Sequence, residues 1–337
     1  MDLREAIIRT VCYFDLFDFP LTRDEVHDWL CGASAGVGEI EATISSLVAS
    51  CVLKSDNGFI SLFDRDGLEK VRAERKVYSE RKWRRARRWA RVFGAFPGVE
   101  LVGVGNTLAY DNARDDSDID FFIVTAPNVI WRTRFFCAAF AAMLDLRPKD
   151  GDNRDKLCLS FFVTTEALEM SKLAYDFRKR HSEEPSDEES QHSKALIADG
   201  VALGSLASLG MTEKAIDIYL YYWTRQMLAL AGNSSVFELF RAANPEIQSR
   251  GMADRSRFLR TVFYPLALFP GAFMRNWQKH HFPKLLIASE ERHDGSVVVS
   301  DSVLKFHVND RRADIYGRWQ KRVQSILHEN AQDHRTN

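Results

Sequence analysis

The sequence predicts an α+β protein in which a small mixed sheet with helices is flanked by a helical module on its N-terminal side and a helical domain on its C-terminal side. Three apolar stretches of strand length, 99–105, 119–125 and 157–165, lie close together, and the apolar segment 128–146 has the length of a helix. Before and after them, apolar residues recur at helical spacing. The predicted boundaries are 1–66 for the module, 67–92 for a basic connecting helix, 93–175 for the sheet core, 176–194 for a polar linker and 195–330 for the helical domain.

The first 66 residues follow the order helix, helix, helix, hairpin. Thr22 and Glu25 have the spacing of a capping box, which would open the second helix. A third helix is expected from about 38 to 50, and Asn57-Gly58 is a strong two-residue hairpin signal in the alternating segment that follows. This order of elements is similar to that of a winged-helix module.

The winged-helix resemblance implies DNA binding through the third helix, so a DNA-binding regulator is one candidate function. That helix contains Glu39 and Glu41 but no Lys or Arg. A recognition helix that faces phosphates needs positive charge. We therefore favour a structural or partner-docking role for this winged-helix-like module.

Positive charge is concentrated in one segment. From Glu69 to Arg91 the chain holds eleven Lys or Arg against three Glu, in a pattern that predicts one long helix. The whole chain has 46 Lys or Arg and 47 Asp or Glu, so any attraction of nucleic acid would have to be local. We favour a solvated helix face whose aliphatic stems cover apolar surface; the alternative is a surface that tracks the phosphates of RNA, DNA or a nucleotide.

The composition favours a cytoplasmic protein without a membrane partner. The start of the chain lacks the apolar stretch of a secretory signal. The longest apolar run, 262–274, is interrupted by Pro265 and Pro270 and is shorter than the roughly 20 residues that span a bilayer. The five cysteines lie far apart, without CxxC pairs, so we expect reduced core residues rather than a zinc site.

The C-terminal region is predicted to be mostly helical. A short strand is expected at 297–299 and a closing helix at 316–327. An apolar stripe at helical spacing predicts a further helix that Gly232 ends. The stripe consists of Ile216, Tyr219, Leu220, Trp223 and Met227.

Two carboxylates open the second predicted strand. Side chains alternate along a strand, so Asp118 and Asp120 should emerge on one face while Ile119 points into the core. Two adjacent carboxylates repel each other unless a positive charge lies between them. Mg²⁺, or Mn²⁺ in its place, prefers oxygen ligands and accepts phosphates as co-ligands. The pair therefore indicates a divalent metal site.

A glycine turn precedes the carboxylate pair. Gly103 and Gly105 free the backbone at the end of the first strand, and the N–H groups of Asn106, Thr107 and Leu108 are expected to open a helix whose N-terminus attracts phosphate. One part of the segment would thus bind phosphate and the other a metal. Together they are suited to metal-assisted transfer of a phosphoryl or nucleotidyl group.

The same residues carry a resemblance to a known family. Val104-Gly105-Asn106, eleven further residues and then Asp118-Ile119-Asp120-Phe121 resemble the signature of DNA polymerase beta-type nucleotidyltransferases, and Ser117 fits its common Ser-Asp-Ile-Asp form. The whole chain is similar to bacterial nucleotidyltransferase-domain proteins with a winged-helix-like front.

The resemblance implies a nucleotidyltransferase core and an activity. A nucleoside monophosphate would pass from an NTP to an acceptor, either a small molecule, a protein or an RNA end, with the help of Mg²⁺ or Mn²⁺. Asp118 and Asp120 would be the catalytic metal ligands. The residues expected to contact the nucleotide are Gly105, Asn106, Thr107 and Ser117.

The chain departs from the family pattern at two places. Asn106 stands where the family usually has Ser. The family's third carboxylate comes from the next core strand, and there strict alternation places Cys158, Ser160 and Phe162 on one face, with Ser160 where an Asp is expected. Asp155 and Glu166 flank this strand. A catalytically reduced nucleotide-binding or protein-interaction module is therefore the alternative function.

Overall fold

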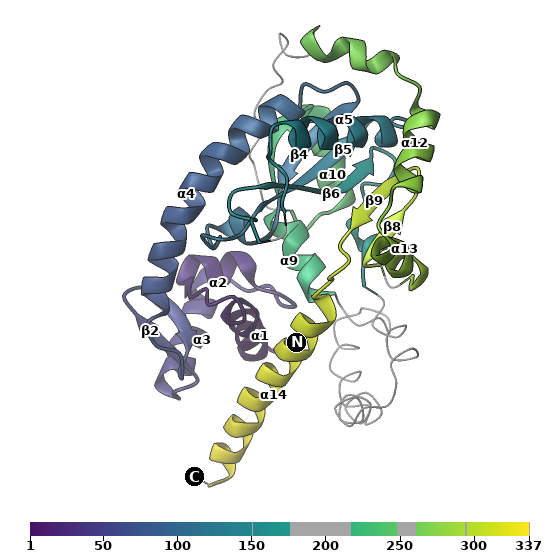
Figure 1. The fold of residues 1–337 in the computed structure, drawn as a ribbon. Coiled ribbons are helices and arrows are strands. Elements are labelled where there is room, and N and C mark those ends of the chain that lie inside the picture. Colours follow the sequence, from purple (N-terminus) through teal and green to yellow (C-terminus); the bar gives the residue numbers. More distant parts are fainter. Residues whose placement is uncertain (150, 176–216, 248–260, 294, 337) are drawn as a thin grey trace. The chain divides into compact units, whose positions relative to one another are not determined.

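The structure is a computed structural model that describes residues 1–149, 151–175, 217–247, 261–293 and 295–336 (Figure 1). The predicted linker 176–194 and Ile216 lie outside these residues. The chain forms two compact units, which are described separately: among the described residues, the first contains 1–74, 217 and 311–336, and the second contains those within 75–175 and 218–310. None of the helices that the structure describes combines the length and the apolar character needed to cross a membrane.

The first unit combines helices with a small antiparallel sheet in the order β1-β3-β2. Thr22 and Glu25 form the predicted capping box, and Asn57 and Gly58 both have positive φ in the predicted hairpin turn. Trp319 donates a hydrogen bond of 2.9 Å from Nε1 to the carbonyl of Arg9, which ties the last helix to the first. The elements are α1 (Leu3–Asp15), β1 (Leu21–Thr22), α2 (Arg23–Trp29), α3 (Val37–Ala49), β2 (Leu53–Asp56), β3 (Phe59–Leu62) and α14 (Arg312–Thr336).

The second unit is built on a six-stranded mixed sheet in the order β7-β4-β5-β6-β9-β8. β5 and β6 are parallel and are joined through helix α5 (Ile130–Met143), while every other neighbouring pair is antiparallel. The predicted strands at 99–105, 119–125, 157–165 and 297–299 are confirmed. The strands are β4 (Val99–Val104), β5 (Ile119–Thr125), β6 (Leu157–Thr164), β7 (Leu228–Gly232), β8 (Val297–Val299) and β9 (Val303–Phe306).

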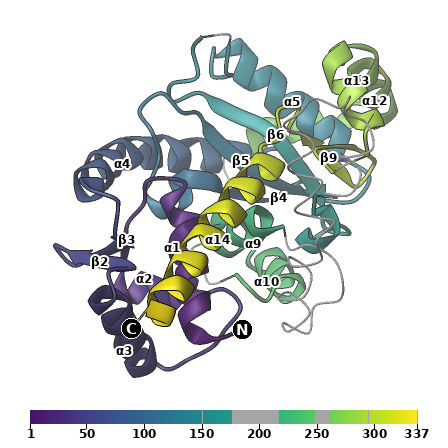
Figure 2. The same ribbon diagram turned by 90° about the horizontal axis from the view of Figure 1, so that it is seen from below.

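Helices cover both faces of this sheet (Figure 2). Because side chains alternate along β5, Phe121 packs in the core beneath α5 and the second half of α4, whereas Phe122 packs in a second core beneath α9 and α10. The covering helices are α4 (Leu68–Phe93), α9 (Ile218–Gln226), α10 (Ser234–Ala243), α12 (Gly271–His280) and α13 (Lys284–Glu291), and the short 3-10 helices are η1 (Asn106–Tyr110), η2 (Met170–Leu173) and η3 (Tyr264–Leu268).

The expectation of a mostly helical region over 195–330 needs correction, because β7 and β9 also come from it and join the sheet together with the predicted strand β8. The helix predicted to run to Gly232 ends at Gln226, and Leu228–Gly232 pairs with β4 instead. A Cβ on Gly232 would lie 2.4 Å from the carbonyl oxygen of Glu100, so glycine permits the close approach of the two strands. Pairing with an open sheet edge thus overrides helix propensity in this segment.

Candidate functional site

The site lies where β5 begins. Ile119 is buried in the core beneath α5, so Asp118 and Asp120 point to the opposite face, as predicted. Burial and, after it, repulsion from Asp120 raise the pKa of Asp118 to about 7. Burial likewise raises the pKa of Asp120, while hydrogen bonds from Asn106 and Cys158 oppose that rise. The two acids therefore form one strongly interacting pair.

Asn106 connects the glycine turn to this pair. Its Nδ2 donates a hydrogen bond of 2.6 Å to Oδ2 of Asp120, and its Oδ1 accepts one of 2.6 Å from the hydroxyl of Tyr219 on α9. Asn106 adopts a left-handed backbone conformation with φ of +57°, which Asn tolerates better than most residues. The side chain that was expected to meet phosphate is thus held on the carboxylate, and the local conformation accounts for Asn in place of Ser.

Gly105 allows α9 to lie against the turn. A Cβ at this position would lie 2.3 Å from Nε1 of Trp223, so only glycine leaves room for the indole ring. The helix expected after the glycine is η1, a 3-10 helix of five residues that includes Thr107. It is too short to provide the dipole of a long helix, and its contribution to anion binding is limited to local backbone N–H groups.

Ser117 belongs to the loop before β5 and not to the carboxylate face. Its hydroxyl donates a hydrogen bond of 3.0 Å to the carbonyl of Arg114, and its own carbonyl accepts one of 2.6 Å from Nζ of Lys82. The structure therefore brings together Gly105, Asn106, Asp118 and Asp120, and it turns the Ser117 hydroxyl towards its own loop.

Alternation along the third strand places Cys158 on the face of the site, but sequence reasoning gave it no role there. In the parallel pairing of β5 and β6 it stands opposite Asp120. Single ligand atoms of Asp118, Asp120 and Cys158 all lie within 4.8 Å of one another, and this is the one such group among the residues that the structure describes. The signal in the sequence is that parallel neighbours begin at the same sheet edge, so the first residues of β6 must lie beside Asp118 and Asp120.

A β-bulge changes which residues of β6 share this face. Asp120 pairs with Cys158, but Phe122 pairs with Phe161, so β6 has one extra residue between these pairs. Phe161 consequently packs beneath α9, and Phe162 packs on the opposite face. The strict alternation expected for Cys158, Ser160 and Phe162 is therefore wrong at Phe162.

A short polar chain leads away from Cys158. Its Sγ lies within hydrogen-bond distance of Oγ of Ser160, at 3.2 Å, and this Oγ lies 3.1 Å from Nε2 of His307. His307 directly follows β9 and its ring packs edge-to-face against Phe161. Nothing in the sequence near the motif points to His307, because only the pairing of β9 with β6 brings it here.

Neither of the flanking acids replaces the third carboxylate. Asp155 binds Lys82 and Arg81, with distances of 2.8 Å from Oδ1 to Nζ of Lys82 and 2.9 Å from Oδ2 to Nε of Arg81. Burial opposes ionisation of Asp155, but these bonds lower its pKa overall. Glu166 is exposed beyond the far end of β6.

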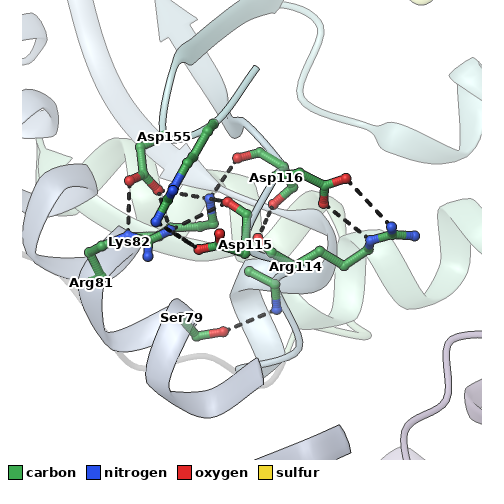
Figure 3. A network of polar contacts seen from close by, with 10 residues as sticks. Ser79, Arg81, Lys82, Arg114, Asp115, Asp116 and Asp155 are labelled. Atoms are coloured by element: carbon green, nitrogen blue, oxygen red, sulfur yellow. Dashed lines mark hydrogen bonds and ion pairs between the residues drawn. The ribbon is translucent and has the colours of Figure 1, made fainter. Parts of the chain in front are cut away.

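The basic helix α4 holds the loop that carries Asp115 and Asp116, just before Asp118 in the sequence (Figure 3). Lys82 is fully buried, and its ammonium group donates to the carbonyls of Asp115 and Ser117 as well as to Asp155. Ser79 accepts a hydrogen bond of 3.0 Å from the backbone N–H of Ala113. The positive charge of Lys82 is therefore used inside the protein, whereas six other cations of the segment are exposed, as expected for a solvated face: Lys70, Lys76, Arg84, Arg87, Arg88 and Arg91.

Comparisons with models of known protein families, with curated proteins and with solved structures found no match. The chemistry of the site therefore has to be argued from its own geometry. Two interacting carboxylates next to a thiol can bind a divalent cation, and a bound cation would offset both the burial and the repulsion that raise the pKa of Asp118.

The raised pKa of Asp118 predicts a specific pH dependence of stability. Between its ordinary pKa of 3.8 and about 7, the folded protein binds more protons than the unfolded chain, so this carboxyl destabilises the fold progressively as the pH rises through that window. We expect Asp118→Asn to increase the free energy of unfolding by about 1–3 kcal/mol above pH 7 and by little near pH 4. Urea unfolding with a chelator present, at several pH values, measures this difference.

Asp116→Asn is the matched control, since Asp116 is exposed in the same loop. Its effect should stay within about 0.5 kcal/mol at every pH. A difference between the wild type and Asp118→Asn that does not change with pH would contradict the assignment.

Proposed function

We propose that the protein is a metal-dependent nucleotidyltransferase of the DNA polymerase beta type, with a core built around β4, β5 and β6. It transfers a nucleoside monophosphate from an NTP to an acceptor that carries a hydroxyl or phosphate group. A hydroxyl acceptor releases its proton to the solvent, the acceptor oxygen bonds to the α-phosphorus, the bond between the α- and β-phosphates breaks, and pyrophosphate leaves. The observation that carries the proposal is the hydrogen bond between Asn106 in the glycine turn and Asp120 in the carboxylate pair.

The donor atoms support binding of a divalent cation by Asp118 and Asp120. Both carboxyls are largely shielded from water and raise each other's cost of ionisation, which a cation would remove. When bound, such a cation neutralises charge on the phosphates. Asn106 keeps Asp120 oriented, and Tyr219 keeps Asn106 oriented, so both would hold the acid ready for the cation.

A second candidate is a module that binds a nucleotide without turning it over. It is favoured by the residues opposite the pair, since Cys158 and Ser160 stand on β6 where a third carboxylate would be expected. A third candidate, the DNA-binding regulator, finds little support. α3 carries Glu39 and Glu41 on its exposed surface, where a recognition helix would carry cations.

Incubation of the full chain with each labelled NTP tests the proposal. The reactions contain Mg²⁺ or Mn²⁺ and, as acceptors, the protein itself, small-molecule pools or RNA, and both label transfer and pyrophosphate release are measured. Transfer that is lost in Asp118→Ala and retained in Asp116→Ala supports the nucleotidyltransferase. Saturable NTP binding without pyrophosphate release supports the second candidate, and an absence of binding contradicts both.

A further inference from the structure

The donor set of the site is unusual for a magnesium enzyme. Magnesium binds oxygen almost exclusively, yet the third group beside Asp118 and Asp120 is the thiol of Cys158. The register of the parallel strands fixes this arrangement, because Cys158 stands directly opposite Asp120. The thiol therefore lies on the neighbouring core strand from which a third carboxylate was sought, two residues before Ser160, where the Asp was expected.

Cys158 also differs from the cysteines that only fill the core. Cys12 and Cys137 are fully buried, whereas Cys158 keeps some solvent exposure and carries polar neighbours on two sides, Asp120 and Ser160. A thiol in a purely structural role is normally surrounded by apolar atoms. Here the polar neighbours are a carboxylate that can share a cation and a hydroxyl that holds the sulfur in place.

We propose that Asp118, Asp120 and Cys158 bind one thiophilic divalent cation, of the Zn²⁺ or Co²⁺ class, through two oxygen atoms and one sulfur. On binding, the thiol releases its proton to the solvent and the thiolate ligates the cation. Three protein ligands leave one position of a tetrahedral cation open for a phosphate oxygen or water. The inference concerns the same site as the proposed function and deepens it, since it names the class of metal that the site selects.

Cobalt is a suitable probe because a Co²⁺–thiolate bond produces a charge-transfer absorption band that oxygen ligands do not give. The full chain is stripped with a chelator and titrated with Co²⁺. We expect one band at saturation that is lost in Cys158→Ser and unchanged in Cys51→Ser, the matched control, whose thiol is exposed. Zn²⁺ should displace Co²⁺ at comparable concentration, and Mg²⁺ should not do so in large excess.

Replacement of the thiol by a carboxylate gives the converse test. We expect Cys158→Asp to lose the cobalt band and to shift the ratio of Mg²⁺ to Zn²⁺ affinity by about 10-fold or more towards Mg²⁺. Should Cys158→Ser fail to fold in a thermal melt, Asp120→Asn, which keeps the thiol, must lower the Co²⁺ affinity by about 10-fold or more. A band that persists in Cys158→Ser, or Co²⁺ binding without a band, overturns the inference.

The two proposals fail in different ways. Label transfer supported by Mg²⁺ in a protein that shows no cobalt–thiolate band removes the thiol ligand and leaves the nucleotidyltransferase standing. A cobalt band that depends on Cys158, in a protein that transfers no label to any acceptor with Co²⁺ or Zn²⁺ as the metal, supports the thiol ligand and counts against the nucleotidyltransferase.

Discussion

Asp120→Asn should lower nucleotidyl transfer by roughly 10³-fold while leaving the fold intact, since removal of a single well-placed charge-stabilising group costs about 10²–10³-fold. Asn has almost the same shape as Asp, and its carbonyl oxygen can accept the hydrogen bond from Asn106. The lost negative charge is the one expected to hold the cation next to the phosphates. The rate of pyrophosphate release at saturating NTP measures the effect.

Asp116→Asn serves as the control for this substitution because Asp116 is exposed and pairs only with Arg114 among the residues described. Its transfer rate should match that of the wild type. Transfer at an undiminished rate in Asp120→Asn would exclude Asp120 from the reaction and, with it, the proposed cation site.

Lys82→Met is expected to have the largest effect on stability, a loss of about 3 kcal/mol in the free energy of unfolding. The substitution preserves the length of the side chain but leaves Asp155 and the carbonyls of Asp115 and Ser117 without their common donor. Removal of one partner of a buried ion pair lowers the free energy of unfolding by more than the intact pair contributes to it, because the remaining charge stays buried without compensation. Urea denaturation monitored by tryptophan fluorescence measures the change.

Arg84→Met on the exposed side of α4 is the matched control, and its effect should stay within about 0.5 kcal/mol. Because Lys82 holds the loop that ends at Asp118, we also expect weaker cation binding in Lys82→Met and no change in Arg84→Met. Equal stabilities of the two variants would show that the interactions of Lys82 are not needed for the fold.

Much of the site could be predicted from a short piece of sequence. The period of two along a strand is local, so it was enough to place Asp118 and Asp120 on one face opposite Ile119. The glycine turn could also be predicted, because it too depends only on residues that are neighbours in the sequence. The close contact of the glycine turn with Trp223 could not be predicted, because it depends on the packing of a helix more than a hundred residues away in the sequence.

The features that local sequence patterns failed to predict depend on pairing between segments that are far apart in the sequence. Leu228–Gly232 was predicted as part of a helix because its apolar spacing fits one, yet an open edge of β4 recruits it as a strand. The bulge in β6 likewise has no signal in the sequence, and it moved Phe162 to the other face. Cys158 was assigned to the core because cysteines among apolar neighbours usually belong there.

The order of the strands has a consequence for how the protein is made. β4, β5 and β6 are synthesised before β7 (residues 228–232) and β9 (residues 303–306). β7 pairs with β4, and β9 pairs with β6. Until those residues emerge, the nascent chain presents two unpaired edges, which are prone to intermolecular association. Translation that stops before residue 307 also yields a polypeptide without the histidine beside Ser160, so the polar contacts next to Cys158 are completed only after that residue is made.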